Sequence, residues 1–195
     1  NPDPKKMFNK DYPFYTSSSK FMVKHFRNYS SWIKKNYLPT NGKLLELGSN
    51  DGTCLNNFKS HFALCFEPSK SVHKEAKSKG LNSINKFFNS QNIKKLVEKN
   101  IKFDVIVGSN VICHIPDQIG LIKNFRKILK DNGQITASNA ELSGNLNFLT
   151  FSYFIKNIII LVLFFIDQSQ AFVYSIGSCP ELPVIRDFDF NKVIL

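Results

Sequence analysis

The chain has 195 residues and a formal net charge of +11. This length accommodates one α/β domain with a sizeable core and excludes two full domains. The charge comes mainly from lysine, because arginine occurs only at Arg27, Arg126 and Arg186, whereas bidentate recognition of bases and phosphates favours arginine. We therefore interpret most of the charge as solvated surface and do not expect a nucleic-acid partner.

The cysteines indicate neither a metal site nor a disulfide framework. Cys54, Cys65, Cys113 and Cys179 stand singly, mostly inside apolar runs, and no C-x-x-C pair occurs. Such thiols suit a reducing compartment. Residues 1–20 contain no apolar core of the kind that a signal peptide needs. These features predict a cytoplasmic protein without a bound metal.

Residues 1–40 are predicted to combine an extended segment with one helix. Proline and serine are frequent in the first part, and the aromatic cluster at residues 12–15 predicts a packing anchor. Between residues 19 and 37, apolar side chains recur at helical spacing. This pattern predicts an amphipathic helix that ends before Pro39.

Residues 43–53 predict a buried strand that ends in a glycine-bearing turn and continues as a helix, which is expected from Gly52 to Lys59. The leucines make the apolar run of a strand that is covered on both faces. Gly48 and Gly52 allow a sharp turn and a close approach to a ligand, and Asn50 tolerates a left-handed conformation. Such a turn aims backbone N–H groups at a ligand above the sheet, and Glu46 favours a ligand with a cationic or hydroxylated part.

A second carboxylate follows the next predicted strand. The apolar residues 62–66 end in Glu67, about 20 residues beyond the turn, where a carboxylate can accept hydrogen bonds from both hydroxyls of an adenosine ribose. The turn lacks the full glycine set of a dinucleotide fingerprint and the Gly-Lys-Ser/Thr of a phosphate loop, so a smaller adenosyl ligand is favoured. The turn is similar to the first motif of class I S-adenosylmethionine-dependent methyltransferases. A glycine turn that only packs is the alternative interpretation.

Strand and helix patterns then alternate as far as residue 138. A helix after Ser69 is expected to end at Gly80, and Phe87-Phe88 lies where a nucleotide-type fold covers the adenine, although two adjacent phenylalanines suit a core equally well. Further on, a strand at residues 103–107 precedes a helix and another strand, expected at residues 134–138. This alternation predicts a doubly wound, mostly parallel, Rossmann-like α/β sheet with right-handed crossovers.

The polar residues after the strand at 103–107 are candidates for chemistry. In an open α/β sheet the ligand crevice lies at the carboxyl ends of the strands. Asn110 and His114 are four residues apart, so one helical turn would place both on a single face. A histidine that is simply bonded to backbone is the alternative for His114.

Beyond the first motif, the chain resembles the nucleotide-sugar C-methyltransferases over residues 11–138. The segments that carry this resemblance are Tyr12-Pro13-Phe14-Tyr15, Ser17-Ser18, Glu46-Leu47-Gly48-Ser49-Asn50-Asp51-Gly52-Thr53, Phe66-Glu67-Pro68-Ser69, Phe87-Phe88, Asn110-Val111 and His114-Ile115-Pro116-Asp117. Members of that family transfer a methyl group from S-adenosylmethionine to a sugar carbon beside a keto group, through an enol or enolate.

The resemblance implies a site with two sides. S-adenosylmethionine would be the cofactor, held by Glu46, Gly48, Ser49, Asn50, Gly52, Glu67, Phe88 and Asn110. The substrate, a small molecule such as a nucleotide-linked ketosugar, would face the catalytic candidates His114, Asn110 and Tyr15, with Tyr12 as the alternative tyrosine.

Two departures from that family weaken the implied activity. Its members usually carry an amino-terminal, cysteine-ligated zinc domain, and no such cysteine pattern occurs here. They also place a Tyr-His-Glu-His element after the fifth strand, whereas no histidine follows His114. A catalytically inactive, methyltransferase-like binding protein is therefore the alternative to an enzyme.

The chain changes character after the predicted cofactor-binding domain at residues 41–140. In the hydrophobic tail, residues 141–195, the stretch 148–166 is long enough to span a bilayer, although Lys156 near its middle opposes this. A buried segment that closes the sheet is the second interpretation. A shift of the reading frame near residues 139–144 is the third.

Overall fold

The computed structural model describes residues 3–140, 146–152, 162–165 and 171–174. The chain divides into two compact units, Asn1–Ile155 and Lys156–Leu195. In the described part of the second unit, β7 (Val162–Phe165) and β8 (Ala171–Tyr174) form an antiparallel pair. The first unit holds the sheet and helices that build the site.

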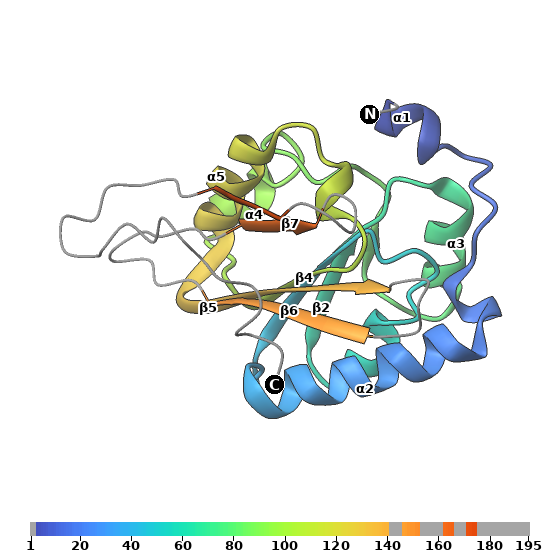
Figure 1. Cartoon of the computed structure of the whole chain (residues 1–195), viewed down its shortest axis with the longest axis horizontal. Helices are drawn as coiled ribbons and strands as arrows, with labels where there is room; N and C mark the ends of the chain where they lie inside the picture. Colours follow the sequence, from blue (N-terminus) through green and yellow to red (C-terminus); the bar gives the residue numbers. More distant parts are fainter. Residues whose placement is uncertain (1–2, 141–145, 153–161, 166–170, 175–195) are drawn as a thin grey trace. The chain divides into compact units, whose positions relative to one another are not determined.

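The sheet of the first unit is six-stranded in its described part, with the order β3-β2-β1-β4-β5-β6 (Figure 1). Its first five strands are parallel, and β6 is antiparallel to β5. This arrangement confirms the predicted Rossmann-like, doubly wound and mostly parallel sheet. The strand bounds are β1 (Lys43–Leu47), β2 (Phe62–Phe66), β3 (Ser83–Ile84), β4 (Phe103–Gly108), β5 (Leu129–Ala140) and β6 (Leu146–Ser152).

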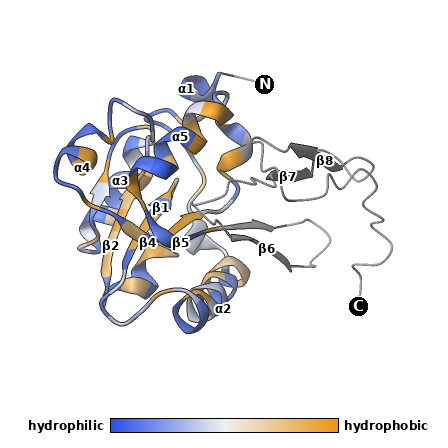
Figure 2. Cartoon of the chain, turned by 90° about the vertical axis from the view of Figure 1, so that its left-hand side faces the viewer, coloured by the Kyte–Doolittle hydropathy of each residue, from blue (hydrophilic) through white to orange (hydrophobic). Residues whose placement is uncertain are grey.

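Strand β1 lies at the centre because both of its neighbours are apolar strands. Leu45 pairs with Leu64 of β2 on one side and with Ile106 of β4 on the other. Residues of β1 and β4 are almost entirely buried, as expected for a parallel sheet covered on both faces. Figure 2 shows these strands as hydrophobic ribbon inside more hydrophilic helices. The parallel order brings the ends of β1, β2 and β4 to one edge.

Helix α2 (Lys20–Asn36) confirms the predicted amphipathic helix. The Ser19 hydroxyl accepts the Met22 backbone N–H at its start, as an N-cap does. Its buried side chains include Tyr29 and Ile33, which join the core beside β1. The remaining helical elements are α1 (Pro4–Met7), η1 (Thr16–Ser18), η2 (Leu55–Phe58), α3 (Lys70–Ser78), α4 (Lys94–Glu98), η3 (Ile112–His114) and α5 (Gln118–Ile128).

Two local expectations differ from the structure. The helix expected between Gly52 and Lys59 is only the 3-10 turn η2, where the Asn57 amide donates to backbone carbonyls of residues 53 and 54 and so competes with helical bonding. The last parallel strand begins at Leu129, earlier than the expected residue 134. The β4 register shifts between Phe103 and Val105 to accommodate the extra residues.

The hydrophobic tail is described in part. Residues 148–152 belong to β6 and residues 162–165 to β7, so these parts of the stretch predicted as a membrane helix are strands. Residues 153–161, like residues 141–145 near the suggested frame shift, lie outside the described residues. Among the described helices, none combines the length and apolarity that a membrane crossing requires.

Candidate active site

The turn after β1 contains three residues in the left-handed region: Gly48 (φ 61°), Asn50 (φ 53°) and Gly52 (φ 79°). A Cβ at Gly48 would collide with Val111, and one at Gly52 would collide with Leu81. Both glycines are therefore required by backbone conformation and by packing against neighbouring loops. Gly48 also borders the cavity described below, whereas Gly52 does not.

Glu67 follows β2 and braces this turn. Its carboxylate accepts the Asn50 backbone N–H at 2.8 Å and the Ser69 backbone N–H at 2.8 Å. The side chain is buried at 4% exposure and borders the cavity. Burial raises the pKa of Glu67, and the two backbone hydrogen bonds oppose that rise. Because each carboxylate oxygen has further lone pairs, Glu67 retains acceptor capacity toward a ligand.

Glu46 of β1 presents a buried oxygen without a partner. The residue is 3% exposed, and its Oε2 has no hydrogen-bond partner. Burial raises the pKa of Glu46 to about 8; a hydrogen bond with Cys54 opposes this rise, and the charge of Glu67 adds to it. Glu46 also borders the cavity. An orphaned buried acceptor of this kind fits a ligand that brings a cationic or donor group.

The raised pKa of Glu46 predicts a pH-dependent stability. Between its ordinary value of 4.5 and about 8, the folded protein binds a proton that the unfolded chain has released, so the free energy of unfolding falls as pH rises. Glu46→Gln should remove on the order of 3 kcal/mol of this fall between pH 5 and 8. Urea unfolding at both pH values measures it.

The exposed Glu98 in α4 provides the matched control. Glu98→Gln should leave the pH dependence as in the unaltered chain, since a surface ion pair contributes little. An unchanged slope in Glu46→Gln would show that Glu46 is ionised in the folded protein.

The carboxyl end of β4 supplies Asn110 and His114. Asn110 has a left-handed φ of 52°, and His114 is the last residue of η3. Both border the cavity, although the expected single helical turn from Asn110 to His114 is absent, because η3 begins only at Ile112. The His114 ring contacts the Phe8 ring edge to face, with centroids 5.7 Å apart. Their chemical roles stay predictions.

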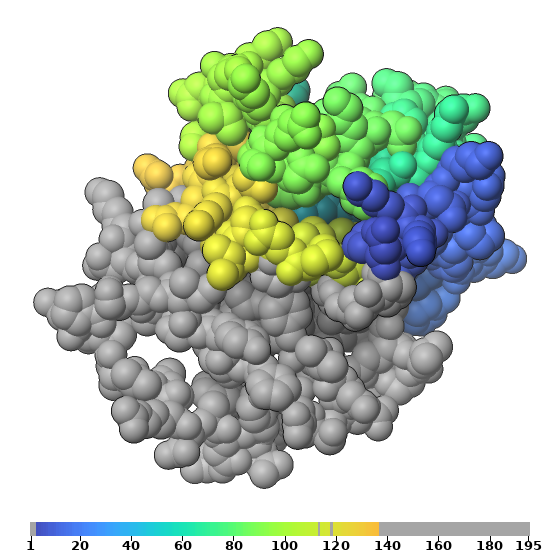
Figure 3. Space-filling view, turned by 90° about the horizontal axis from the view of Figure 1, so that it is seen from above, coloured from blue at the N-terminus to red at the C-terminus, as the bar shows by residue number. Residues whose placement is uncertain are grey.

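A segment from the start of the chain forms another side of the cavity. We call residues 3–17 the N-terminal wall. Its Phe8, Tyr12 and Phe14 border the cavity, and the charge of Glu67 contributes, after burial, to a raised pKa of the Tyr12 hydroxyl. Figure 3 shows the start of the chain, in blue, beside the yellow segment that follows β4. The wall thus faces both the cofactor candidates and His114.

Together these elements enclose a cavity of about 750 Å³ at the carboxyl ends of β1, β2 and β4. This volume lies within the range of small-molecule sites. The site residues predicted from the sequence that border it are Glu46, Gly48, Ser49, Asn50, Glu67, Phe88, Asn110 and His114. The other two, Tyr15 and Gly52, do not border it, and the alternative tyrosine, Tyr12, does.

Several lining residues were not predicted. Met22 and Phe26 of α2 border the cavity, although their helical spacing suggested only core packing. Lys5, Lys123 and Lys127 add basic side chains. The sequence holds no signal for these lysines, because similar lysines are scattered over the whole chain. Phe88 also packs between the rings of Phe66 and Phe125, with centroids 5.5 Å from each.

The site has the groups that an adenosyl cofactor with a cationic amino acid part requires. Glu67 offers acceptors for hydroxyl groups, Glu46 offers an unpartnered acceptor, and Phe87 and Phe88 offer apolar surface. In the described part of the chain, no group of three or more His, Cys, Asp and Glu side chains is placed to hold a metal ion.

Many solved protein chains share this fold, among them the following two. One is a candidate S-adenosyl-L-methionine-dependent methyltransferase from Methanococcus maripaludis (14% identity, TM-score 0.51), where the match covers 63% of this chain and 59% of that one. The other is the plantazolicin methyltransferase BpumL with a pentazolic desmethylPZN analog and SAH (16% identity, TM-score 0.51), covering 72% and 55%. The chain thus spans under three fifths of their lengths. At such identities the likeness concerns the fold alone.

No curated protein matches the chain. A family model described as a methyltransferase domain, however, matches residues 22–153, which include the glycine turn, both buried glutamates and the end of β4. The chain therefore belongs to the methyltransferase-domain family, with the class I fold of S-adenosylmethionine-dependent methyltransferases.

Proposed function

We propose that the chain is an S-adenosylmethionine-dependent methyltransferase that methylates a carbon of a small molecule, such as a nucleotide-linked ketosugar. The observation that carries the proposal is the unpartnered, buried oxygen of Glu46 beside a cavity that Glu67 also borders. Glu67 suits ribose hydroxyls. Glu46, which holds a proton in the ligand-free protein at neutral pH, suits a cationic amino group whose charge favours release of that proton. Family membership supports the reaction class.

In this proposal, residues 41–140 hold the cofactor and residues 1–40 complete the substrate side. The cofactor supplies an electrophilic methyl group when it is bound. Glu67 and Glu46 orient it, and Phe88 covers its adenine side. The turn was expected to aim N–H groups at the ligand, but those of Gly48, Asn50 and Gly52 bond within the protein, to Phe66, Glu67 and Ser49. The free, buried thiols of Cys54 and Cys65 support the expected cytoplasmic location.

The substrate side needs a group that handles a proton or an oxygen. His114 is exposed at the cavity and is the only one of the chain's histidines that borders it; His25, His61 and His73 do not. We assign to His114 the polarisation or protonation of the substrate oxygen, with Asn110 and Tyr12 as neighbouring hydrogen-bonding groups. Tyr15, the other predicted tyrosine, does not border the cavity and could contact the substrate only after a conformational change.

A catalytically inactive binding protein is the second candidate. It is favoured by the lack of any histidine after His114, where the resembling family places its base. Such a protein would bind the cofactor through the same residues as the proposed enzyme, but it would not transfer the methyl group.

Calorimetry with S-adenosylmethionine, followed by incubation with a nucleotide-linked 4-ketosugar, tests both candidates. We expect binding, and release of S-adenosylhomocysteine that depends on the sugar and is lost in His114→Ala. Binding without release from a panel of ketosugars would favour the inactive protein. A chain that is folded but does not bind the cofactor would overturn the proposal.

A further inference from the structure

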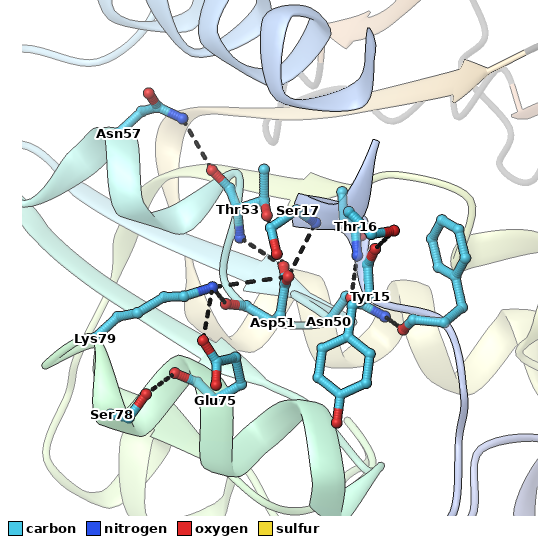
Figure 4. Close-up of polar contacts among 12 residues, drawn as sticks. Tyr15, Thr16, Ser17, Asn50, Asp51, Thr53, Asn57, Glu75, Ser78 and Lys79 are labelled. Carbon is cyan, nitrogen blue, oxygen red and sulfur yellow. Dashed lines mark hydrogen bonds and ion pairs between the residues drawn. The ribbon is translucent and has the colours of Figure 1, made fainter. Parts of the chain in front are cut away.

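The side chain of Asn50 connects the glycine turn to the N-terminal wall. Its Oδ1 accepts the Thr16 backbone N–H at 2.9 Å, and its Nδ2 donates to the Phe14 carbonyl at 3.0 Å. Figure 4 shows Thr16 lying over Asn50. Both ends of the amide are therefore engaged with a segment that is more than thirty residues away in the sequence.

The next residue adds a second connection. Asp51 Oδ2 accepts the Ser17 backbone N–H at 2.9 Å, and Asp51 itself is fully buried. Lys79 holds Asp51 from the other side, with Nζ 2.9 Å from its carbonyl and 3.7 Å from Oδ2 (Figure 4). The wall is thus attached to the turn through three backbone groups, the Phe14 carbonyl and the N–H groups of Thr16 and Ser17.

These attachments determine where the aromatic groups of the wall lie. Downstream of them the chain enters α2, and upstream it carries Phe14, Tyr12 and Phe8 along the cavity. The Tyr12 carbonyl has a weaker attachment, because it accepts the Ser71 hydroxyl at 3.2 Å. Without the Asn50 contacts, the aromatic side of the cavity would depend on the Ser17 bond to Asp51, on the Ser71 bond to Tyr12 and on ring packing of Phe8.

Asn50 also touches the cofactor side. Its backbone N–H donates to Glu67 Oε2 at 2.8 Å, and Glu67 is the residue proposed to hold the ribose. One residue therefore links the group that would orient the cofactor to the wall that would meet the substrate. A ligand that binds more tightly when the turn is ordered also shifts the protein toward the state in which the wall is attached. Attachment of the wall raises the affinity for that ligand by the same factor.

We propose that Asn50 is a positioning residue that holds the N-terminal wall across the cavity and couples its closure to occupation of the cofactor side. The inference rests on the proposed function only for the identity of the ligand. In this proposal, the Asn50 side chain contacts the N-terminal wall and not the cofactor. The substrate side of the cavity is complete only while Asn50 is bonded to Thr16 and Phe14.

The test uses Asn50→Gly in the full chain, with Asn100→Gly as matched control. Both positions have a left-handed φ, 53° and 48°, so glycine suits both backbones equally, and Asn100 does not border the cavity. Amide hydrogen exchange at Ser17 is read by NMR, because no variant alters the Ser17 bond to Asp51. S-adenosylhomocysteine is the ligand probe, and its Kd is measured by calorimetry.

We expect Ser17 to exchange at least about tenfold faster in ligand-free Asn50→Gly than in Asn100→Gly. S-adenosylhomocysteine should slow Ser17 exchange in the unaltered chain and in Asn100→Gly. In Asn50→Gly it should still bind, within about tenfold of the unaltered affinity, but should slow the exchange far less. Unaltered Ser17 protection in a folded Asn50→Gly would overturn the inference.

A second variant removes the same contact from the other side. Thr16→Pro deletes the N–H that Asn50 accepts and leaves the glycine turn untouched; proline suits the first position of a helical turn. It should reproduce the faster Ser17 exchange. If the unaltered chain does not bind S-adenosylhomocysteine, the proposed function fails, while the ligand-free exchange of both variants still decides the role of Asn50.

Discussion

Glu67→Ala is expected to weaken S-adenosylhomocysteine binding at least 100-fold, or about 2.7 kcal/mol. The substitution removes the proposed ribose acceptor and also leaves the backbone N–H groups of Asn50 and Ser69 without their acceptors. A buried donor that loses its partner costs about 1–3 kcal/mol, so the glycine turn should also lose its ordered geometry. Calorimetry below the melting temperature separates this loss of affinity from unfolding.

The control for this prediction is Glu98→Ala, which removes an exposed glutamate paired with Lys94 on α4. It should change the affinity by less than about twofold, because exposed ion pairs contribute little. Affinity in Glu67→Ala within threefold of the unaltered chain would contradict the assignment of Glu67 to the ligand.

Gly48→Ala should destabilise the protein and abolish cofactor binding. The left-handed φ of 61° costs a side chain about 1–2 kcal/mol, and the new Cβ would collide with the Val111 side chain. Because Val111 follows Asn110, the collision should also displace the end of β4 from the cavity. We expect a loss of about 3 kcal/mol in the free energy of unfolding, measured by urea denaturation.

The two causes of this loss can be separated by a second substitution. In Gly48→Ala with Val111→Ala, the collision is relieved, while the backbone cost remains. The double variant should therefore lose less stability than the sum of the two single variants. Strict additivity would show that Val111 does not obstruct a side chain at position 48.

Short-range patterns in the sequence were sufficient for the central α/β layer. Strand β1, its glycine turn and helix α2 were predicted because periodic apolar residues and left-handed positions are local properties. The spacing from the turn to Glu67 likewise reflects the single connection, through η2, between β1 and β2. The structure places Glu67 at the cavity, and its role toward a ribose stays a prediction.

Other features depended on contacts between distant parts of the chain. Gly52 and Asn50 both looked like ligand-approach residues, yet Gly52 faces Leu81 and the Asn50 amide holds the N-terminal wall. The choice between Tyr12 and Tyr15 could not be made from the motif that contains both. The expected helix after Gly52 was wrong, because side-chain bonds to the backbone shorten it to η2.

The amino-acid sequence by itself therefore determined the class of fold and led to the proposed cofactor residues, since both follow from the order of strands, glycines and acidic residues along one stretch. Only the tertiary structure decided which aromatic residues face the cavity and how Asn50 is used. Those outcomes rest on hydrogen bonds and packing between residues far apart in the chain, whose partners are selected when the chain folds and leave no periodic trace in the sequence.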